Sequence, residues 1–467
     1  MTTEYAGKKT AVIGMARTGL AAARALTDLG ASVTLYDRKP ASELADALRE
    51  ASELGAQVRP GADEVDLSNV DMLVPSPGVR RDAPSLAEAA RRGIPVISEI
   101  ELAYRISPAP IIAITGTNGK TTTTVLTGLM LRADGQDTFI AGNVVAGDIR
   151  MPLITAAAQA ARDSVIVAEI STFQLEWIES FRPAIAALLN IGCDHQDRHA
   201  SIEEYADLKA SVFRNQGADD CSVANADQPM VIAHTRELRS RVLQFSRLIE
   251  PTEGAFVRGG DLIVRLGGEE LRVCERADIR IPGEHNVENV LAASVMAAAY
   301  GVRPDAVLEV VRGFTGVEHR LEFLGKIDGV EYINNSMCTN VDAVVRSIEA
   351  IEPPVIVIAG GKDKGSDWAP FADVVKRRVK GLVLIGVSAP ILERAVRDAG
   401  YAGVTTASDL EDAFDIARSL ASPGDSVILA PGCASFDMFS GFEERGRLFK
   451  EIVRRCQDAA GQGGGVR

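Results

Sequence analysis

A loop in the second hundred residues has the composition of a nucleotide-binding loop. In the stretch IAITGTNGKTTTTVL (111–125), an apolar run leads into Gly116 and Gly119, which allow tight turns of positive φ. Lys120 follows and can pair with β- and γ-phosphates, while Thr121 can offer its hydroxyl to Mg²⁺. A helix that begins here would point its positive end at the bound anion. The residues that we expect to contact ATP are Gly116, Thr117, Asn118, Gly119, Lys120, Thr121 and Thr122.

The loop departs from the usual phosphate loop at one position, because Ile114 occupies the place of the first glycine. The alternative interpretation is an ordinary turn between a strand and a helix, with the Lys120 amine in solvent. We favour nucleotide binding because strand, glycines, lysine and threonine follow one another in the order and spacing that phosphate binding requires.

Three further side chains could take part in chemistry. Glu169 ends the apolar strand SVIVAE, and His195 follows the strand AIAALLN. Such strand ends frequently form sites in α/β proteins, but a solvated strand end has the same pattern. Lys209 lies on the predicted amphipathic helix 203–214, where a lysine ordinarily extends its amine into solvent. The i,i+4 spacing of His195 and His199 is weak evidence for zinc, because the surrounding acidic residues indicate a loop.

The N-terminal segment carries part of a dinucleotide-binding motif. IGMARTG contains Gly14 and Gly19, but Ala16 replaces the middle glycine that lets the backbone approach a pyrophosphate. Asp37 ends the second predicted strand, where dinucleotide-binding proteins have an acidic residue. An NAD-dependent dehydrogenase is therefore one alternative that this segment leaves open.

These residues need α/β domains to position them. Strand and helix patterns alternate over 9–105, and a second unit starts at Ile111 after a Ser-Pro-Ala-Pro linker. Short strands and turns over 221–275 predict an antiparallel annex, and after about Val317 three apolar strands each run into a loop of small residues. We predict an α/β protein with a Rossmann-like N-terminal domain, a central P-loop-type ATPase domain with a mixed sheet, and a Rossmann-like C-terminal domain. The predicted domains are 1–107, 108–316 and 317–467, with a disordered tail over 458–467.

The composition argues against several classes of protein. The chain has 467 residues, a formal net charge of −14 and a pI near 5.0. We therefore expect no nucleic-acid partner, because nucleic acid requires a basic surface. We find no secretory signal, no apolar run of about 18 residues, and no C-x-x-C motif among six scattered cysteines. These features predict a cytoplasmic protein without a membrane span, and we expect a monomer.

The loop TGTNGKT and several other motifs resemble those of the Mur ligases, the ATP-dependent amide-bond enzymes of peptidoglycan synthesis. The motifs follow the family's order along nearly the whole chain: SPG (76–78), AEISTFQLE (168–176), DHQDRH (194–199), Lys209, GEHNVEN (283–289), EHR (318–320) and PGCASFDMF (431–439). STFQLE and CASFDMFSGFEERG are most similar to members that add glutamate. The resemblance implies that ATP drives the ligation of glutamate, with D-glutamate favoured, to UDP-N-acetylmuramoyl-L-alanine through an acyl phosphate.

The resemblance also implies roles for individual residues. The catalytic set would be Lys120, Glu169, His195 and Lys209, and the ligands of two Mg²⁺ ions would be Thr121, Glu169, His195 and Lys209, the last as a carbamate formed from CO₂. ATP would also contact Asn286, Asn289, Arg320 and Asn335. The UDP-sugar would contact Arg17, Thr18, Asp37, Arg38, Ser76, Gly78, Asn143 and Ser171. The incoming glutamate would contact Thr339, Lys364, Ser435, Phe436 and Phe442.

Two of these expectations have alternatives in the residues themselves. Asn286 and Asn289 lie one helical turn apart and could read the edge of adenine, but asparagine also caps helices well. Lys364 would hold a carboxylate, and a solvated loop lysine is the alternative.

The chain departs from the family pattern in two places. The family's N-D-S-K-A-T-N reads NNSMCTN over 334–340, so Asn335 replaces an acid and Met337 a lysine. Asn335 could still bond a ribose hydroxyl, at a cost of about 1 kcal/mol in lost charge assistance. The family's G-N-I-G reads GNVV over 142–145. These changes leave the choice of amino acid and its stereochemistry open.

Three other functions remain as alternatives. A folylpolyglutamate synthase shares the loop but typically lacks a complete N-terminal domain of this kind. A dehydrogenase would leave the Lys120 loop and the Glu169 and His195 pair without a role. A non-catalytic, ATP-binding regulator would be consistent with Met337.

Overall fold

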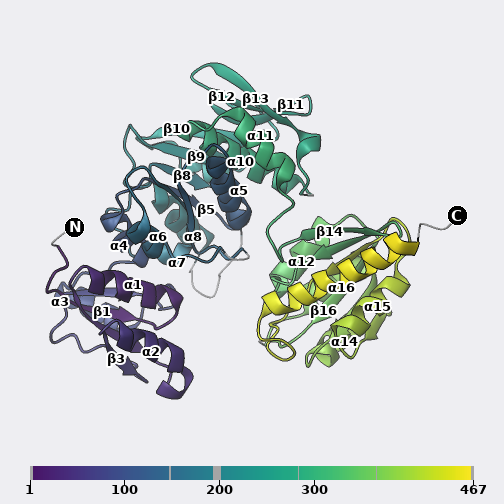
Figure 1. Cartoon of the computed structure of the whole chain (residues 1–467), viewed down its shortest axis with the longest axis horizontal. Coiled ribbons are helices and arrows are strands. Elements are labelled where there is room, and N and C mark those ends of the chain that lie inside the picture. Colours follow the sequence, from purple (N-terminus) through teal and green to yellow (C-terminus); the bar gives the residue numbers. More distant parts are fainter. Residues whose placement is uncertain (1–3, 147–148, 193–200, 282, 364, 464–467) are drawn as a thin grey trace. The chain divides into compact units, whose positions relative to one another are not determined.

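The chain forms two compact units (Figure 1). One unit comprises Met1–Ile279 and His285–Gly313, and the other comprises Arg280–Glu284 and Phe314–Arg467. The structure is a computed structural model that describes residues 4–146, 149–192, 201–281, 283–363 and 365–463. None of the helices in these ranges is both long enough and apolar enough to cross a membrane.

The first unit begins with a parallel four-stranded sheet in the order β3-β2-β1-β4. Its strands are β1 (Lys9–Ile13), β2 (Ser32–Asp37), β3 (Gln57–Pro60) and β4 (Met72–Pro75). The helices are α1 (Arg17–Asp28), α2 (Ala45–Glu53), α3 (Pro84–Arg92) and α4 (Glu99–Ile106). Parallel neighbours cannot be joined by a hairpin, so the alternation of apolar strands with helices in the sequence dictates this arrangement.

A nine-stranded sheet follows in the same unit, in the order β13-β12-β11-β10-β9-β8-β5-β7-β6. Its strands are β5 (Ile111–Thr115), β6 (Thr138–Gly142), β7 (Val165–Glu169), β8 (Ile185–Leu188), β9 (Cys221–Asn225), β10 (Arg241–Ser246), β11 (Gly254–Arg258), β12 (Asp261–Leu266) and β13 (Glu269–Glu275). The helices are α5 (Lys120–Ala133), α6 (Leu153–Gln159), α7 (Thr172–Leu175), α8 (Ile202–Ala210), α9 (Pro229–Ala233), α10 (Glu284–Tyr300) and α11 (Pro304–Gly313).

The predicted antiparallel annex is smaller than expected. Strands β9, β10 and β11 pair in parallel, and only the β11–β12 and β12–β13 pairs are antiparallel. The direction of pairing follows from the segments that connect the strands. Gly259-Gly260 and Gly267-Gly268 have positive φ at both positions, as a tight hairpin requires, whereas α9 separates β9 from β10.

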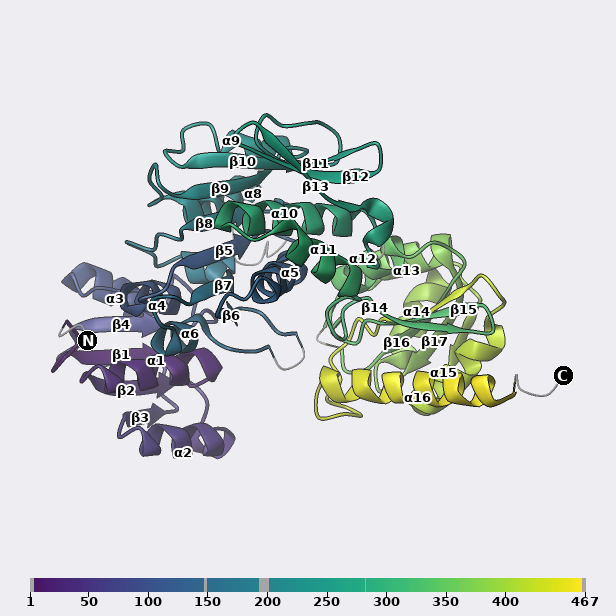
Figure 2. The same ribbon diagram turned by 45° about the horizontal axis from the view of Figure 1, so that its top comes forward.

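The second unit contains a six-stranded sheet in the order β14-β15-β19-β16-β17-β18, with one antiparallel pair, β14–β15. Its strands are β14 (Glu322–Ile327), β15 (Val330–Asn334), β16 (Val355–Gly360), β17 (Val379–Ile385), β18 (Val404–Thr406) and β19 (Ser426–Leu429). Helices α12 (Val341–Ala350), α13 (Ala369–Arg378) and α14 (Ala389–Asp398) cover one face, and α15 (Leu410–Leu420) and α16 (Phe442–Gly463) cover the other (Figure 2). Helix α16 continues to Gly463, so the tail expected to be disordered from residue 458 is helical as far as that residue.

A buried carboxylate joins the two sheets of the first unit. Glu101 on α4 accepts hydrogen bonds from three consecutive backbone N–H groups, those of Glu179, Ser180 and Phe181. It also accepts from the Ser180 hydroxyl and pairs with Arg105. Burial raises the pKa of Glu101, but these donors together hold it below its ordinary value. The carboxylate therefore fixes α4 against the segment that leads from α7 into β8.

Candidate active site

The phosphate loop lies between the end of β5 and the start of α5, as the sequence predicts. Gly116 has a φ of 155° and Gly119 a φ of 80°. A Cβ added to Gly119 would lie 2.3 Å from Asn289 Oδ1, and one added to Gly116 would lie 3.0 Å from Leu189 Cβ. Both glycines are therefore required by backbone conformation and by close neighbours.

The loop is held by a residue that the sequence analysis did not single out. Asn190, two residues after the end of β8, accepts from the Asn118 N–H through Oδ1 (2.7 Å) and donates to the Asn118 carbonyl (3.0 Å). Its own carbonyl accepts from the Thr117 N–H (3.0 Å), and the Thr117 hydroxyl accepts from the Gly192 N–H (2.9 Å). The signal in the sequence was an asparagine at the end of the strand AIAALLN.

Two lysines converge on one carbonyl oxygen of the loop. Lys120 Nζ donates to the carbonyls of Gly116 and Thr117, at 2.9 Å each, and Lys209 Nζ donates to the same Gly116 carbonyl at 2.8 Å. Lys209 is only 2% exposed, and its amine lies 4.4 Å from the centre of the Tyr205 ring. The Lys209 amine therefore does not extend into solvent, as a lysine on such a helix ordinarily would. Two lysine amines lie at the loop that we expect to bind phosphate.

Glu169 connects the loop to the neighbouring strand. Its carboxylate is buried at the end of β7, where it accepts from Thr121 Oγ1 (2.7 Å) and from Asn143 Nδ2 (3.2 Å). Within the described residues, no group of three or more His, Cys, Asp or Glu side chains forms a metal centre. Carboxylate and hydroxyl oxygens nevertheless suit Mg²⁺, which takes its remaining ligands from phosphate and water. His195, the other predicted ligand, lies outside the described residues.

The asparagines of α10 pack against the loop. Asn289 is buried, its Oδ1 accepts from the Thr123 hydroxyl (3.2 Å), and its Nδ2 donates to Asn286 Oδ1 (3.0 Å). These contacts tie α10 to α5 and explain why Gly119 has no room for a side chain. The contact with adenine stays a prediction. Thr122 is buried in the first turn of α5.

Four of the predicted UDP-sugar residues, Arg17, Thr18, Asp37 and Ser76, lie at or beside the turn after β1. Asp37 accepts from the backbone N–H groups of Met15 (2.7 Å) and Lys39 (2.9 Å), so its carboxylate orders this turn. A Cβ on Gly14 would lie 2.7 Å from Ser76 Oγ. Arg17 and Thr18 lie in the first turn of α1, Arg38 and Gly78 are exposed, and Ser171 bonds Gln174 in a capping box before α7.

In the second unit, Asn335 is engaged within the chain. Its Oδ1 accepts from the Leu321 N–H (3.1 Å) and its Nδ2 donates to Ser347 Oγ, which itself donates to the Ala343 carbonyl. Arg320 lies between two residues of positive φ, His319 at 63° and Leu321 at 44°. Contacts of Arg320 and Asn335 with ATP stay predictions.

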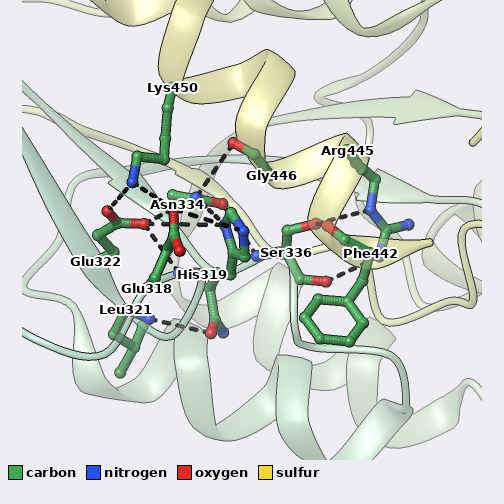
Figure 3. Close-up of polar contacts among 11 residues, drawn as sticks. Glu318, His319, Leu321, Glu322, Asn334, Ser336, Phe442, Arg445, Gly446 and Lys450 are labelled. Carbon is green, nitrogen blue, oxygen red and sulfur yellow. Dashed lines mark hydrogen bonds and ion pairs between the residues drawn. The ribbon is translucent and has the colours of Figure 1, made fainter. Parts of the chain in front are cut away.

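A buried guanidinium holds the strand ends of the second unit (Figure 3). Arg445, 1% exposed, donates to Ser336 Oγ (3.0 Å), to the Ser336 carbonyl (2.9 Å) and to the Cys433 carbonyl (3.3 Å). The Ser336 hydroxyl donates in turn to the Phe442 carbonyl at the start of α16 (2.7 Å). Burial lowers the pKa of Arg445 to about 10. This residue was not predicted as part of the site, and its position in FEERG gave no signal of burial.

The predicted glutamate contacts lie around the same strand ends. Ser435 is buried after β19, while Phe436 is 70% exposed. The Phe442 ring meets the His319 ring edge to face, with centroids 6.2 Å apart. Thr339 is half-buried before α12, and Lys364 lies outside the described residues.

Beside the Arg445 contacts, Figure 3 shows a second set of polar contacts, around the buried His319 and Asn334 side chains. Asn334 Nδ2 donates to His319 Nδ1 (2.9 Å) and Glu322 Oε2 (3.1 Å), and Lys450 pairs with Glu318 and Glu322. Burial lowers the pKa of His319 despite the nearby carboxylates. An imidazole whose Nδ1 accepts a hydrogen bond carries its proton on Nε2.

Comparison with known proteins places the chain in a family. Family models match residues 8–98 (Mur ligase MurD-like, N-terminal domain), 114–297 (Mur ligase middle domain) and 319–433 (Mur ligase, glutamate ligase domain). The chain is 45% identical over 457 residues to a UDP-N-acetylmuramoylalanine--D-glutamate ligase of Pelotomaculum thermopropionicum, covering 97% of this chain and 99% of that protein. It is 42% identical to the protein of the same name from Thermoanaerobacter sp., covering 96% and 99%.

A solved structure has the same fold. The crystal structure of UDP-N-acetylmuramate-alanine ligase MurC from Thermotoga maritima matches with a TM-score of 0.57 at 18% identity, covering 97% of this chain and 99% of that one. At this identity the match supports the three-domain architecture alone. The full-length sequence identities and the three family matches together show that the chain belongs to the Mur ligase family.

Proposed function

We propose that the protein joins D-glutamate to UDP-N-acetylmuramoyl-L-alanine at the expense of ATP, in the cytoplasm, as a step of peptidoglycan precursor synthesis. The names of the full-length relatives support the reaction. The observation that carries the proposal is the convergence of Lys120, Lys209 and Glu169 on one glycine loop. This cluster joins the Lys120 amine, which can pair with phosphate, with oxygen ligands for Mg²⁺.

The first chemical step activates a carboxylate. The free carboxylate of the alanyl residue attacks the γ-phosphorus of ATP, the bond to the β-phosphate oxygen breaks, and ADP leaves. Lys120 and the positive end of α5 hold the transferred phosphoryl group, so catalysis is mainly positioning and charge stabilisation. Mg²⁺, held by Glu169 and Thr121, supplies charge neutralisation when bound.

The second step forms the amide. The amine of glutamate attacks the acyl carbon, the tetrahedral adduct collapses, and inorganic phosphate leaves while the nitrogen loses a proton. Phosphorylation is needed because a carboxylate otherwise has only oxide as its leaving group. We place the sugar nucleotide at the β1–α1 turn and glutamate near Ser435 and Phe442.

Phosphate release from Mg·ATP tests the reaction. We expect release only when UDP-N-acetylmuramoyl-L-alanine and one amino acid are both present, with D-glutamate preferred over L-glutamate, L-lysine and diaminopimelate. Equal rates with all four amino acids, or release without the nucleotide sugar, would contradict the proposal. A preference for another amino acid would support the same class of reaction with a different substrate. The departures from the family motif at Asn335 and Met337 would then be the first positions to test.

We also propose that Lys209 carries a carbamate that helps to hold a second Mg²⁺. Its amine is buried at the same Gly116 carbonyl as the Lys120 amine, beside the proposed Mg²⁺ ligands, and a carbamate forms when a lysine amine takes up CO₂ and releases a proton. We expect Lys209→Ala to lose activity and to regain part of it in added short carboxylic acids. Full activity of the variant without any rescue would overturn this part of the proposal.

A further inference from the structure

The phosphate loop lacks the first glycine of the usual motif because a paired strand occupies that place. Ile114 is fully buried in β5, where it pairs with Glu169 of β7 and with Ala187 of β8. The strand continues to Thr115, so only residues 116–119 separate it from α5. A loop this short has few groups of its own with which to hold its shape, so its backbone N–H and carbonyl groups need partners from another segment.

Asn190, in the segment that follows β8, supplies those partners. Its side chain bonds both backbone groups of Asn118, because Oδ1 accepts from the N–H (2.7 Å) and Nδ2 donates to the carbonyl (3.0 Å). The Asn190 carbonyl accepts from the Thr117 N–H (3.0 Å). Two consecutive N–H groups of the loop therefore donate to one residue. In this arrangement Thr117 and Asn118 shape the loop, and the charges that suit phosphate are those of Lys120 and of the positive end of α5.

The backbone on both sides of Asn190 is fixed in turn by side chains at and after the end of β9. Asn225 Nδ2 donates to the Leu189 carbonyl (3.1 Å), and Gln228 Oε1 accepts from the Ile191 N–H (3.1 Å). Strands β5, β8 and β9 are neighbours in the central sheet (Figure 1). The sheet therefore sets the direction of the Asn190 amide, and the amide in turn holds the loop.

We propose that Asn190 is a positioning residue that holds the shortened loop in the shape that binds the phosphates of ATP. This inference rests on the proposed function, because it assumes that ATP binds at this loop. A purely structural role explains the contacts less well. Asn118 is exposed and Asn190 is only partly buried, so hydrogen bonds between them compete with water and add little to global stability. The same bonds fix both backbone groups of the residue that leads directly into Gly119 and Lys120.

Nucleotide-specific kinetics of the full-length enzyme test the inference. In Asn190→Ala the N–H and carbonyl of Asn118 lose their side-chain partner, and the loop must then be ordered by the nucleotide itself. We therefore expect the KM for ATP to rise about 10-fold, while the KM values for UDP-N-acetylmuramoyl-L-alanine and D-glutamate change less than about 2-fold. An unchanged KM for ATP, or an equal rise in all three KM values, would overturn the role of Asn190.

Asn215→Ala is the matched control. Asn215 is a partly buried asparagine of the same unit, and its amide also makes two bonds to the backbone, with the carbonyls of Glu179 and Phe181 before β8. The control should keep the KM for ATP within about 2-fold of the parent value. If Asn215→Ala raises this KM as much as Asn190→Ala does, the effect is a general one and the inference is overturned.

Hydrogen exchange separates a change of loop shape from a general loss of stability. Without nucleotide, Asn190→Ala should speed the exchange of the backbone amides of residues 116–120 about 10-fold and leave those of β12 and β13 unchanged. Asn215→Ala should leave the exchange of residues 116–120 unchanged. Equal acceleration over the whole sheet, or no acceleration in the loop, would contradict the positioning role.

Lys120→Ala separates the inference from the function on which it rests. If kcat/KM for ATP is unchanged in both Lys120→Ala and Asn190→Ala, the loop is not the phosphate site, and the inference is overturned together with that part of the proposed function. If Lys120→Ala loses activity while Asn190→Ala keeps the ATP kinetics of the parent, only the role of Asn190 is overturned. Losses in both variants, with the rise in KM for ATP confined to that substrate in Asn190→Ala, support the inference.

Discussion

The carboxyl ends of the central sheet and of the C-terminal sheet use charge in opposite ways. At the central sheet, the Lys120 and Lys209 amines share one backbone carbonyl, and the Glu169 carboxylate is bonded by two neutral side chains. At the C-terminal sheet, the Arg445 guanidinium is enclosed and bonds backbone carbonyls and a hydroxyl of the strand ends. The first arrangement gathers charge around a place for ligands, and the second fixes the shape of loops.

The difference shows that burial of a charged group does not by itself reveal its role. Lys209 and Arg445 are both almost fully buried. Lys209 bonds the phosphate loop beside Lys120, whereas Arg445 joins the segments after β15 and β19 to the start of α16. Changes at the central site should therefore reduce activity more than stability, and changes at Arg445 should do the reverse.

The largest effect should come from Lys120→Ala. We expect kcat/KM for the ligation to fall by about 10³-fold or more, equivalent to at least about 4 kcal/mol, because the transferred phosphoryl group loses its ammonium partner. Thermal unfolding should change little. Lys326→Ala, at an exposed lysine that pairs with Glu331 on the surface, is the control and should retain activity. A Lys120→Ala enzyme within 10-fold of the parent rate would contradict the proposed centre.

Arg445→Met should chiefly reduce stability. Removing the guanidinium leaves the Ser336 and Cys433 carbonyls without these donors, so we expect the free energy of unfolding to fall by about 4 kcal/mol. Urea denaturation measures the loss. Arg454→Met, on the exposed side of the same helix, should cost less than about 0.5 kcal/mol. Equal losses in the two variants would show that the internal bonds of Arg445 are unimportant.

The pH dependence of stability should report the burial of Glu99. Because its folded-state pKa, about 7, lies above the ordinary value of 4.5, the native state binds the proton more tightly than the unfolded state. The contribution of Glu99 to the free energy of unfolding is fully present below about pH 4.5. As the pH rises to about 7, this contribution, on the order of 3 kcal/mol, is lost. Relative to Glu99→Gln, the parent protein should thus become progressively less stable between these pH values in urea titrations. If the unfolding free energies of the parent and of Glu99→Gln change with pH in parallel, the raised pKa of Glu99 is contradicted.

The smallest predicted effect concerns Asn335→Asp, which restores the family's acidic residue. A carboxylate oxygen would face Ser347 Oγ, whose proton is committed to the Ala343 carbonyl, so we expect a loss of about 1 kcal/mol in unfolding free energy. In a Ser347→Ala background the loss should shrink. If the aspartate instead stabilises the protein in both backgrounds, the hydrogen bond from the Asn335 amide to Ser347 does not contribute to stability as we expect.

Much of the fold could be predicted because its determinants are local. Apolar strands alternating with helices specify parallel sheets, and two Gly-Gly pairs specify the hairpins of β11, β12 and β13. The antiparallel annex predicted over 221–275 was too large. Strands β9 and β10 are joined by helix α9 and not by a turn, so they pair in parallel. The disorder predicted from residue 458 was also wrong as far as Gly463. That prediction depended on the Gly-rich composition, but α16 continues to Gly463.

For the candidate site, the sequence by itself determined the phosphate loop, because strand, glycines, Lys120 and Thr121 are contiguous and their spacing alone sets their geometry. Only the tertiary structure decided which distant groups meet them. The Asn190 bonds to the loop, the convergence of Lys209 on Gly116, the bond from Thr121 to Glu169 and the burial of Glu99 and Arg445 all depend on the packing of elements far apart in the chain. Residue types can suggest such partners, but hydrogen bonds and desolvation depend on distances of a few ångströms that packing alone fixes.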